Sequence, residues 1–424
     1  MYVTQKLASE AVAAVLDGRN LTDVLARQRS REALEPRQRA AIQDISYGTL
    51  RRWGEIEFML GQLLSRPDTD PALRALLATG LYQLGWGRAA PHAIVDHAVK
   101  VASRIQAGRG KGLVNAVLRN FLRRKDELLA AARQDERARW NHPGWWVAAM
   151  REAYPEHWQA VLAANDQHPP MSLRVNLRQG TREAYLAELE AEGLAAAADG
   201  AAGLRLAQPV PIERLPRFQD GACSVQDIGA QWAAPLLDVA DGMRVLDACC
   251  APGGKTGHLL ELADCTLTAL DADAERLRRV ASNLERLGLA AELKVGDAGQ
   301  PAGWWDGQPF DRILADVPCS AAGVARRHPD IKWLRRPDDF AQFATQQAAI
   351  LAALWGCLKP GGKLLYVTCS VFPQENQQQV ADFLSRHADA RRLPLPDHLP
   401  DDGQLLPNDR HDGFFYALLY KTPT

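Results

Sequence analysis

The sequence predicts a multidomain protein with an all-α bundle, a small α/β domain, and a larger α/β domain built on a mostly parallel sheet. Three observations carry this prediction. Residues 1–140 place apolar residues at helical spacing and show few strand signals. Residues 141–220 mix strand-like and helical stretches. From residue 221 onward, strand-like and helical segments alternate, which is typical of a parallel sheet covered by helices on both faces.

The helical part shows its periodicity in three stretches, 31–64, 70–86 and 110–129. In the last of them, "GKGLVNAVLRNFLRRKDELL", the spacing predicts a core-facing set and a solvent-facing set. The core-facing set is Leu113, Val117, Leu118, Phe121 and Leu122, and the solvent-facing set is Arg119, Arg123, Arg124 and Lys125. Proline, glycine and three tryptophans in "WNHPGWWVAAM" break the pattern, so we expect a domain boundary near residue 141.

The remaining segments follow in an order that fixes the predicted sheets. The small domain, 141–220, has strand-like segments at 171–179 and 203–210 around a helix at 181–194. The larger domain, 221–424, has strands predicted at 243–249, 266–273, 291–295, 310–317 and 362–370, with helices at 254–263, 274–288 and 338–358. The last strand, 412–421, directly follows a loop, so we expect it to pair antiparallel.

Composition excludes several classes of protein. The 424 residues are 47% hydrophobic and 24% charged, as in ordinary globular chains, and no apolar run approaches the ~20 residues of a membrane span. The N-terminus lacks the features of a signal peptide. Seven cysteines, with no C-x-x-C pair, argue against a disulfide framework and a zinc ribbon. We therefore expect a reduced, cytoplasmic protein without a metal site or a membrane partner.

Charge is distributed unevenly along the chain. Residues 1–140 carry 23 Lys and Arg against 15 Asp and Glu, a net of +8, whereas the rest of the chain has a net of −9. A basic half joined to an acidic half indicates that the first half meets a polyanion. The alternative is a solvated helical surface with a chance excess of arginine.

Acidic residues and glycines follow the first strands of the larger domain. Ligands of such sheets bind outside the carboxyl ends of the strands. Asp247, Asp271 and Asp297 each stand at or just after a successive strand, and Gly253 and Gly254 let the backbone pass close to a ligand. An acid at the second strand can bind both hydroxyls of a ribose, and Asp297 can contact an adenine edge.

Two phosphate-binding motifs are excluded. A P-loop would need glycine at position 249, which is Cys249, and the G-x-G-x-x-G motif is absent. A nucleoside-bearing ligand without a pyrophosphate indicates S-adenosylmethionine.

Six motifs of the larger domain resemble the RNA cytosine-5 methyltransferases: "DACCAPGGKT", "DADAERL", "GDA", "DVPCSAAGVARRHPDIKW", "LKPGGKLLYVTCSVFPQEN" and "DGFFYA". In the helical half, "HAIVDHAVKVAS" and "KGLVNAVLRNFLRR" resemble NusB-type RNA-binding domains. The combination is similar to the bacterial RsmB (Sun/Fmu) family, which methylates a cytosine of small-subunit ribosomal RNA. The resemblance implies a Rossmann-like methyltransferase domain, a monomer, and an RNA partner.

The resemblance also implies which residues bind S-adenosylmethionine. One cofactor loop and three acids are expected: Cys249, Cys250, Ala251, Pro252, Gly253, Gly254 and Lys255, with Asp271, Asp297 and Asp316. One departure is visible, because Cys250 stands where the family commonly has alanine. Both side chains are small, although an extra thiol beside the site could oxidise.

Two cysteines, Cys319 and Cys369, stand at the ends of two separate predicted strands. Carbon-5 of cytosine is a poor nucleophile until a thiolate adds to carbon-6, and the adduct must later lose a proton and expel the sulfur. Asp316 is suited to hold the exocyclic amine and ring nitrogen of the base. The residues alone leave open which cysteine attacks. The resemblance assigns attack to Cys369 and release to Cys319, whereas DNA cytosine methyltransferases use the cysteine of a Pro-Cys pair.

Basic residues directly follow the Pro-Cys motif. We expect Arg326, Arg327, His328 and Lys332 to contact RNA phosphates near the target base, the alternative being a plain solvated loop. Reaching the ring of a cytosine requires an unstacked or flipped base.

Two other functions stay open at this point. One is methylation of a transfer RNA, and the other is a non-catalytic NusB-like RNA-binding or antitermination factor. A non-catalytic factor would have no need of Cys319, Cys369 and Asp316 together.

Overall fold

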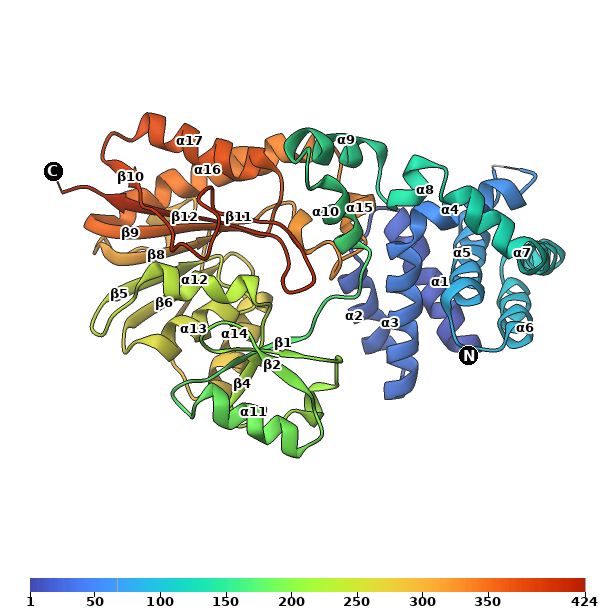
Figure 1. Cartoon of the computed structure of the whole chain (residues 1–424), viewed down its shortest axis with the longest axis horizontal. Helices are drawn as coiled ribbons and strands as arrows, with labels where there is room; N and C mark the ends of the chain where they lie inside the picture. The colour runs from blue at the N-terminus through green and yellow to red at the C-terminus, as the bar shows by residue number, and fades with distance from the viewer. Residues whose placement is uncertain (67, 424) are drawn as a thin grey trace. The chain divides into compact units, whose positions relative to one another are not determined.

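The computed structural model describes residues 1–66 and 68–423 and divides them into two compact units. The first unit joins Met1–His168 to a distant segment, Ala325–Arg336. The second contains Pro169–Val324 and the chain from Pro337 onward. The first unit therefore extends past residue 140, where the sequence predicts its end, because the next two helices cluster with the helical part (Figure 1).

The first unit is all-α, as predicted, and its core surrounds α5 (Pro71–Trp86), which has buried residues along most of its length. Its other helices are α1 (Tyr2–Leu16), α2 (Leu21–Arg31), α3 (Pro36–Arg51), α4 (Trp53–Leu63), α6 (Pro91–Ala102), α7 (Lys111–Ala132), α8 (Glu136–Trp140), α9 (Gly144–Ala153), α10 (Trp158–Asn165) and α15 (Ile331–Leu334). Helices α3 and α5 cross closely: a Cβ at Gly48 would lie 2.0 Å from the Tyr82 ring. Glycine is therefore required there.

Helix α7 confirms part of the predicted sidedness. Val117, Leu118 and Phe121 are buried in the core. Leu113 and Leu122 are each 37% exposed, so their predicted place in the core is wrong. They lie at the edges of the apolar face, where solvent still reaches a long side chain.

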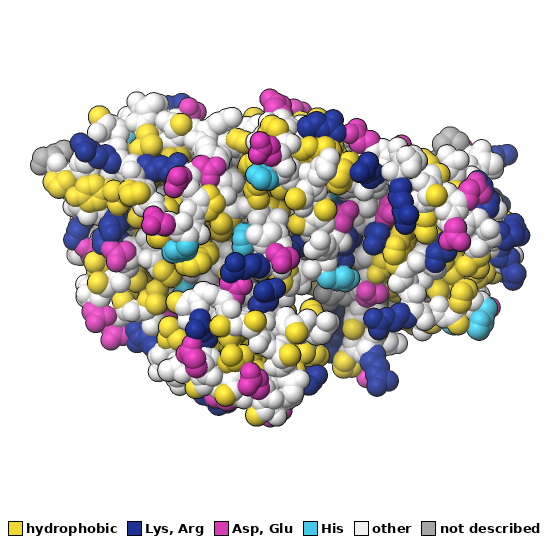
Figure 2. Space-filling model, in the orientation of Figure 1, with side chains coloured by type: hydrophobic (Ala, Val, Ile, Leu, Met, Phe, Trp, Pro, Cys, Tyr) yellow, Lys and Arg dark blue, Asp and Glu magenta, His cyan; other side chains and the backbone are white. Residues whose placement is uncertain are grey.

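The basic residues of α7 differ in environment. Arg119 and Arg123 are exposed. Figure 2 shows Lys and Arg side chains gathered over α7, at the right of the view. Lys125 is half-buried, because its ammonium donates hydrogen bonds to the carbonyl oxygens of Leu84 and Gly85. A cation at these carbonyls stabilises the end of α5, where backbone acceptors lack helical partners.

The segment Ala325–Arg336 is built into the helical unit. The Asp330 carboxylate accepts a hydrogen bond from the backbone amide of Leu21 at the start of α2, at 2.9 Å. The Trp333 indole donates to the carbonyl oxygen of Leu50 near the end of α3, at 2.8 Å. This unit is therefore discontinuous in sequence.

Lys332 forms a buried ion pair within the same unit. Its ammonium lies 2.8 Å from an Asp166 carboxylate oxygen and donates to the carbonyl oxygen of Arg51 at 3.1 Å. The Lys332 side chain is completely buried. Burial lowers the pKa of Lys332 despite the pair with Asp166.

The second unit begins with a small antiparallel sheet in the order β2-β3-β1-β4. Its strands are β1 (Ser172–Val175), β2 (Ala196–Ala198), β3 (Gly203–Leu206) and β4 (Cys223–Val225). Helix α11 (Arg182–Ala191) buries Tyr185 and Leu189 in the apolar cluster of this sheet. Arg174 of β1 pairs with Glu261 at 2.8 Å, and both side chains are buried.

The larger sheet has the order β10-β12-β9-β8-β5-β6-β7, and β11 pairs with β12. Its strands are β5 (Arg244–Ala248), β6 (Thr266–Asp271), β7 (Glu292–Val295), β8 (Phe310–Asp316), β9 (Leu358–Thr368), β10 (Ala390–Arg392), β11 (Gln404–Leu405) and β12 (Phe414–Lys421). Strands β5 to β9 run parallel, and β12 pairs antiparallel with β9. The predicted fold class, with its antiparallel last strand, is confirmed.

Helices cover both faces of the larger sheet, and successive strand residues alternate between them. Leu314 of β8 packs in the cluster with α12 (Ala233–Leu237), α13 (Gly254–Leu262) and α14 (Ala274–Leu287). Its neighbour Ile313 packs in the cluster with α16 (Asp339–Cys357) and α17 (Gln377–Arg386). Among the described residues, no helix is long and apolar enough to cross a membrane.

The buried Lys332 pair gives a stability prediction. Lys332→Ala should lower the free energy of unfolding by about 3–5 kcal/mol, because it leaves the Asp166 charge without its partner. Lys100→Ala is the matched control: its pair with Asp96 is exposed and should contribute at most about 1 kcal/mol. Calorimetry of the full chain measures both. Equal, small losses would show that the Lys332 pair is dispensable.

Candidate active site

The candidate site lies where β5, β6, β8 and β9 end. The chain leaves β5 for β6 and β7 on one side and returns to β8 and β9 on the other. Such a reversal opens a crevice outside the carboxyl ends of the central strands. Most of the predicted catalytic and cofactor residues belong to the loops at this edge.

The loop between β5 and α13 is held in an unusual backbone path. Cys249 has a φ of 60°, Ala251 and Pro252 are joined by a cis peptide bond, and Gly253 has a φ of 93°. A Cβ at Gly253 would also lie 3.0 Å from Val280 Cγ1. Glycine therefore satisfies both the dihedral angle and the packing there. A Cβ at Gly254 would meet only Gln226 Nε2, at 3.7 Å, so this turn is open.

Asp271, at the end of β6, fastens the same loop. One of its carboxylate oxygens accepts from the Ala251 amide at 3.1 Å, and the other accepts from the Asp273 amide at 3.0 Å. The guanidinium of Arg276 donates to the Ala251 carbonyl oxygen at 2.9 Å. Each Asp271 oxygen has a second lone pair, so the carboxylate can still accept from a ligand.

Asp247, at the end of β5, is completely buried. Thr256 donates a 2.6 Å hydrogen bond to its Oδ2, whereas Oδ1 accepts none from the described residues. Burial is the main cause that raises the pKa of Asp247 to about 7. A buried acceptor without a donor fits a site that receives a donor from a ligand.

Asp297 lies after β7 and is exposed. Its carboxylate accepts from the Gly299 amide at 2.8 Å and from the Gln300 amide group at 3.2 Å. Its carbonyl oxygen accepts from the Trp304 indole at 2.8 Å. The structure therefore has Asp297 at the expected strand end, organising a turn.

The two strand-end cysteines lie side by side. Cys319 follows β8 and Cys369 follows β9, and these strands are parallel neighbours. Their sulfur atoms are 3.4 Å apart, and both residues are half-buried. Two thiols separated by fifty residues in sequence can therefore reach the same bound group.

An ion pair lies in the same crevice. The Lys255 ammonium, near the start of α13, is 2.7 Å from an Asp316 carboxylate oxygen at the end of β8. Burial lowers the pKa of Lys255, but Asp316, and to a lesser extent Cys369, outweigh this effect and raise it overall. Lys255, expected among the cofactor contacts, thus directs its charge to Asp316.

Three thiols at this edge of the sheet have pKa values above the ordinary value for cysteine. The hydrogen bond with Cys369, together with burial and the nearby charge of Glu375, holds the pKa of the Cys319 thiol well above its ordinary value. Burial likewise raises the pKa of Cys249 and Cys250. The thiolate is the form that oxidises readily, so burial of Cys250 disfavours the form in which it would oxidise.

Glu375 was missed by the sequence analysis. It is completely buried, and it accepts hydrogen bonds from Ser320 and Ser370, the residues that directly follow the two cysteines. The repeated Cys-Ser pair was the available signal, together with the acid six residues after Cys369.

Two of the four predicted RNA contacts do not fit the structure. Arg326 and Lys332 are buried in the helical unit, and Lys332 is paired with Asp166. A buried cation does not reach a phosphate, so the prediction is corrected for these two residues. Arg327 and His328 are half-buried.

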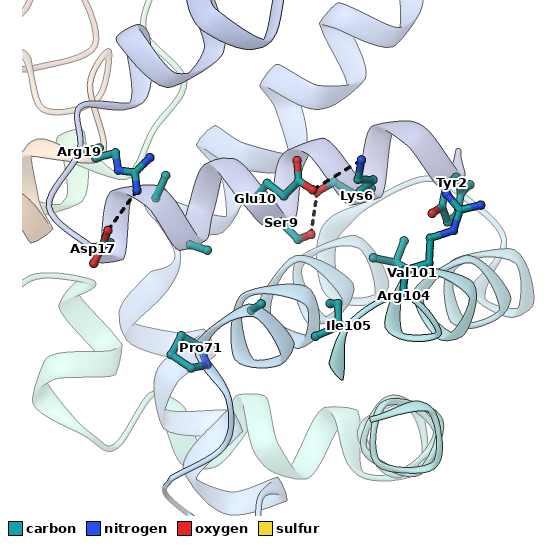
Figure 3. Close-up of a pocket in the computed structure, with 13 residues that line it drawn as sticks. Tyr2, Lys6, Ser9, Glu10, Asp17, Arg19, Pro71, Val101, Arg104 and Ile105 are labelled. Atoms are coloured by element: carbon teal, nitrogen blue, oxygen red, sulfur yellow. Dashed lines mark hydrogen bonds and ion pairs between the residues drawn. The ribbon is translucent and has the colours of Figure 1, made fainter. Parts of the chain in front are cut away.

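A hollow of about 450 Å³ lies elsewhere, in the helical unit, among α1, the start of α5 and the chain after α6 (Figure 3). Its lining is mostly apolar, and two ion pairs lie on it, Lys6–Glu10 at 3.7 Å and Arg19–Asp17 at 3.3 Å. Arg104 stacks over the Tyr2 ring at 5.2 Å. None of the predicted site residues lines this hollow.

Three family models match the chain. Residues 234–420 match the 16S rRNA methyltransferase RsmB/F model, residues 142–213 match its ferredoxin-like domain, and residues 3–123 match the NusB family. These matches follow the three predicted domains in order.

Relatives that match over nearly the full length carry the name of a ribosomal RNA methyltransferase. The chain is 44% identical to ribosomal RNA small subunit methyltransferase B of Serratia proteamaculans, over 99% of both chains. It is 46% identical to the Pseudomonas putida protein of that name, over 98% of this chain and 97% of the relative.

A methyltransferase homologue from Pyrococcus horikoshii aligns with a TM-score of 0.59 at 27% identity, over 67% of this chain and 97% of that one. NSun6 from the same organism, solved with SFG, aligns with a TM-score of 0.60 at 20% identity, over 66% and 99%. From the family models and the full-length relatives, this chain belongs to the RsmB/F family of 16S rRNA methyltransferases.

Proposed function

We propose that this methyltransferase of small-subunit ribosomal RNA moves a methyl group from S-adenosylmethionine to carbon-5 of one cytosine, through a covalent bond between Cys369 and the base. The observation that carries the proposal is the 3.4 Å separation of the Cys319 and Cys369 sulfur atoms, beside the Lys255–Asp316 pair. A structural role for either cysteine would not require the other thiol at that distance.

The chemistry of the base explains the need for two thiols. The Cys369 thiolate forms a bond to carbon-6, and the electron pair of the carbon-5–carbon-6 double bond makes carbon-5 nucleophilic. S-adenosylmethionine, when bound, supplies an electrophilic methyl group to that carbon. Cys319, as a thiolate, takes the carbon-5 proton, and the electrons of the broken carbon–hydrogen bond restore the double bond. The sulfur–carbon bond breaks at the same time, and its electron pair returns to the Cys369 sulfur.

The raised pKa of the Cys319 thiol bears on its proposed role in release. Because the pKa of Cys319 is raised, mainly by the hydrogen bond with Cys369, Cys319 keeps its proton at neutral pH. Cys319 is a poor nucleophile while it keeps this proton, and it can take the carbon-5 proton during release only after its own proton has left. The family resemblance assigns the attack to Cys369.

Lys255 and Asp316 suit the polar edge of the base. A carboxylate accepts hydrogen bonds and fits the exocyclic amine, whereas an ammonium donates and fits the ring nitrogen or carbonyl oxygen. Their mutual ion pair orients both groups before the base arrives. Donation to the ring also stabilises the electron density that the attacking thiolate pushes into it.

The cofactor residues fit S-adenosylmethionine in four respects. The buried Asp247 Oδ1 can accept from a donor group of the ligand, and the open turn at Gly254 leaves room for close approach. Asp271 offers acceptors for the ribose hydroxyls, and Asp297 is exposed at the next strand end. The RNA would be held by the basic helical unit, with Arg327 and His328 as proposed phosphate contacts.

The cofactor site gives a binding prediction. Asp271→Asn keeps the shape of the side chain but removes charge-assisted acceptors, so affinity for S-adenosylmethionine should fall about 10- to 100-fold. Asp264→Asn is the matched control, because Asp264 lies just before the start of β6, away from the candidate site, and its side chain is exposed. Calorimetric titration decides between them. An unchanged affinity in Asp271→Asn would remove Asp271 from the cofactor site.

Asp247 gives a pH prediction for the protein without cofactor. Its pKa is about 7 in the folded state and near 3.8 when unfolded. Between these two pH values the folded chain holds a proton that the unfolded chain has released. Stability contributed by this group is therefore full below about pH 4 and falls as pH rises to about 7, by at most about 4 kcal/mol. Asp247→Asn should flatten this fall in urea titrations from pH 5 to 8. An identical pH profile in wild type and variant would contradict the burial argument.

Substitution of each cysteine should stop the reaction at a different step. Cys369→Ala should abolish methylation and form no RNA adduct, since the attacking thiolate is gone. Cys319→Ala should still attack and methylate, but the product should stay bound through Cys369 as a complex that survives denaturing electrophoresis. In the double variant the complex should disappear.

Bisulfite sequencing of ribosomal and transfer RNA from cells with and without the gene identifies the modified base. A stable adduct in Cys369→Ala, with none in Cys319→Ala, would reverse the two roles. Full activity in both variants would show that the two cysteines have only a structural role.

A further inference from the structure

The two Cys-Ser turns meet at one buried carboxylate. Ser320 donates to Glu375 twice, from its hydroxyl to Oε2 at 2.6 Å and from its backbone amide to Oε1 at 2.7 Å. The Ser370 hydroxyl donates to the same Oε2 at 2.5 Å. The two serine hydroxyl oxygens are 3.1 Å apart. Glu375 therefore ties together two turns that come from different strands.

The tie is itself braced by the helices and strands around it. The Gln347 amide group, on α16, donates to Glu375 Oε1 at 3.1 Å and to the carbonyl oxygen of Pro318 at 2.9 Å. The Tyr366 hydroxyl, on β9, donates to the Glu375 backbone carbonyl at 2.7 Å. Both carboxylate oxygens thus accept from two donors, which fixes the side chain in one orientation.

We propose that Glu375 is a positioning residue for methyl transfer, which holds the Cys319 and Cys369 turns together so that both sulfur atoms address one base. This inference rests on the proposed roles of the two cysteines. Glu375 acts through Ser320 and Ser370 and has no part in the bonding to the base.

Geometry makes such a tie necessary. One sulfur must bond to carbon-6 while the other reaches the same adduct, and a misplacement of about 1 Å can cost about 100-fold in rate. The two turns belong to separate strand-to-helix connections, so strand pairing alone fixes only their starting points. The carboxylate is suited to this task because all its polar neighbours are donors. A glutamine would point an NH₂ group at some of them.

The test compares Glu375→Gln, Ser320→Ala and Ser370→Ala with two control variants of the full chain. Ser385→Ala removes an exposed hydroxyl of α17 that bonds only the Asp382 carbonyl among the contacts described for it. Glu292→Gln removes an exposed carboxylate of β7 that accepts from Thr268. S-adenosylmethionine affinity and melting temperature show whether each variant is folded.

Thiol juxtaposition is measured without RNA, by oxidation with 2,2′-dithiodipyridine. One cysteine displaces a pyridine-2-thione from the reagent, and the second then displaces the other, leaving a Cys319–Cys369 disulfide and two released thiones. Mass spectrometry of the linked peptides gives the rate for this pair. In Glu375→Gln we expect the disulfide to form about 10- to 100-fold more slowly, and kcat to fall about 100-fold, with S-adenosylmethionine affinity within about threefold of wild type.

Each serine variant should slow both rates about tenfold, because it loses one hydrogen bond to a charged group. Both controls should match wild type. Unchanged disulfide formation and kcat in folded Glu375→Gln would overturn the proposal. Should Glu375→Gln fail to bind S-adenosylmethionine, the serine variants decide: a tenfold loss in both supports the tie, and unchanged rates in both overturn it.

The disulfide rate also separates this proposal from the roles of the cysteines. Slow disulfide formation in Glu375→Gln, alongside full activity of Cys319→Ala and Cys369→Ala, would keep the tie but remove the proposed chemistry. Loss of activity in the cysteine variants, with unchanged disulfide formation in Glu375→Gln, would keep the chemistry and remove the tie.

Discussion

Parallel pairing of β5, β6, β8 and β9 is the constraint on which the site depends. Parallel strands present their carboxyl ends at the same edge, so the residues after each strand meet although the chain separates them widely. That edge holds Asp247, Asp271, Asp316 and both strand-end cysteines. Helices pack on both faces of the sheet, which leaves this edge as the place where polar side chains can gather around a ligand.

Patterns with a local cause were predictable from the sequence. Alternating strands and helices indicated the sheet, and they predicted Asp247, Asp271 and Asp316 at strand ends, where the structure has them. Partnerships between distant side chains were not predictable. Lys255 was expected among the cofactor contacts, yet its charge pairs with Asp316. Lys332 was expected to contact RNA phosphates, yet it is buried against Asp166. Spacing in the sequence shows which face a residue occupies, but it does not show which charge another segment brings to that face.

The buried polar groups of the protein find their partners in more than one way. Arg174 and Glu261 neutralise each other, and Lys332 and Asp166 do the same in the helical unit. Glu375 is surrounded by neutral donors, so its charge is spread over hydrogen bonds. Asp247 has one hydroxyl donor and an oxygen that accepts from none of the described residues, and burial is the main cause that raises its pKa. The group with the fewest partners lies where a ligand is expected.

The discontinuity of the helical unit has a consequence during protein synthesis. Residues 1–168 leave the ribosome first, but Ala325–Arg336, which carries the buried Lys332 and Trp333, follows only after most of the second unit. At about 5–20 residues per second, this interval lasts on the order of ten to thirty seconds. During that time Asp166 lacks its cation, and the apolar surface that Trp333 covers stays open. The helical unit therefore completes its fold late, although most of it is translated early.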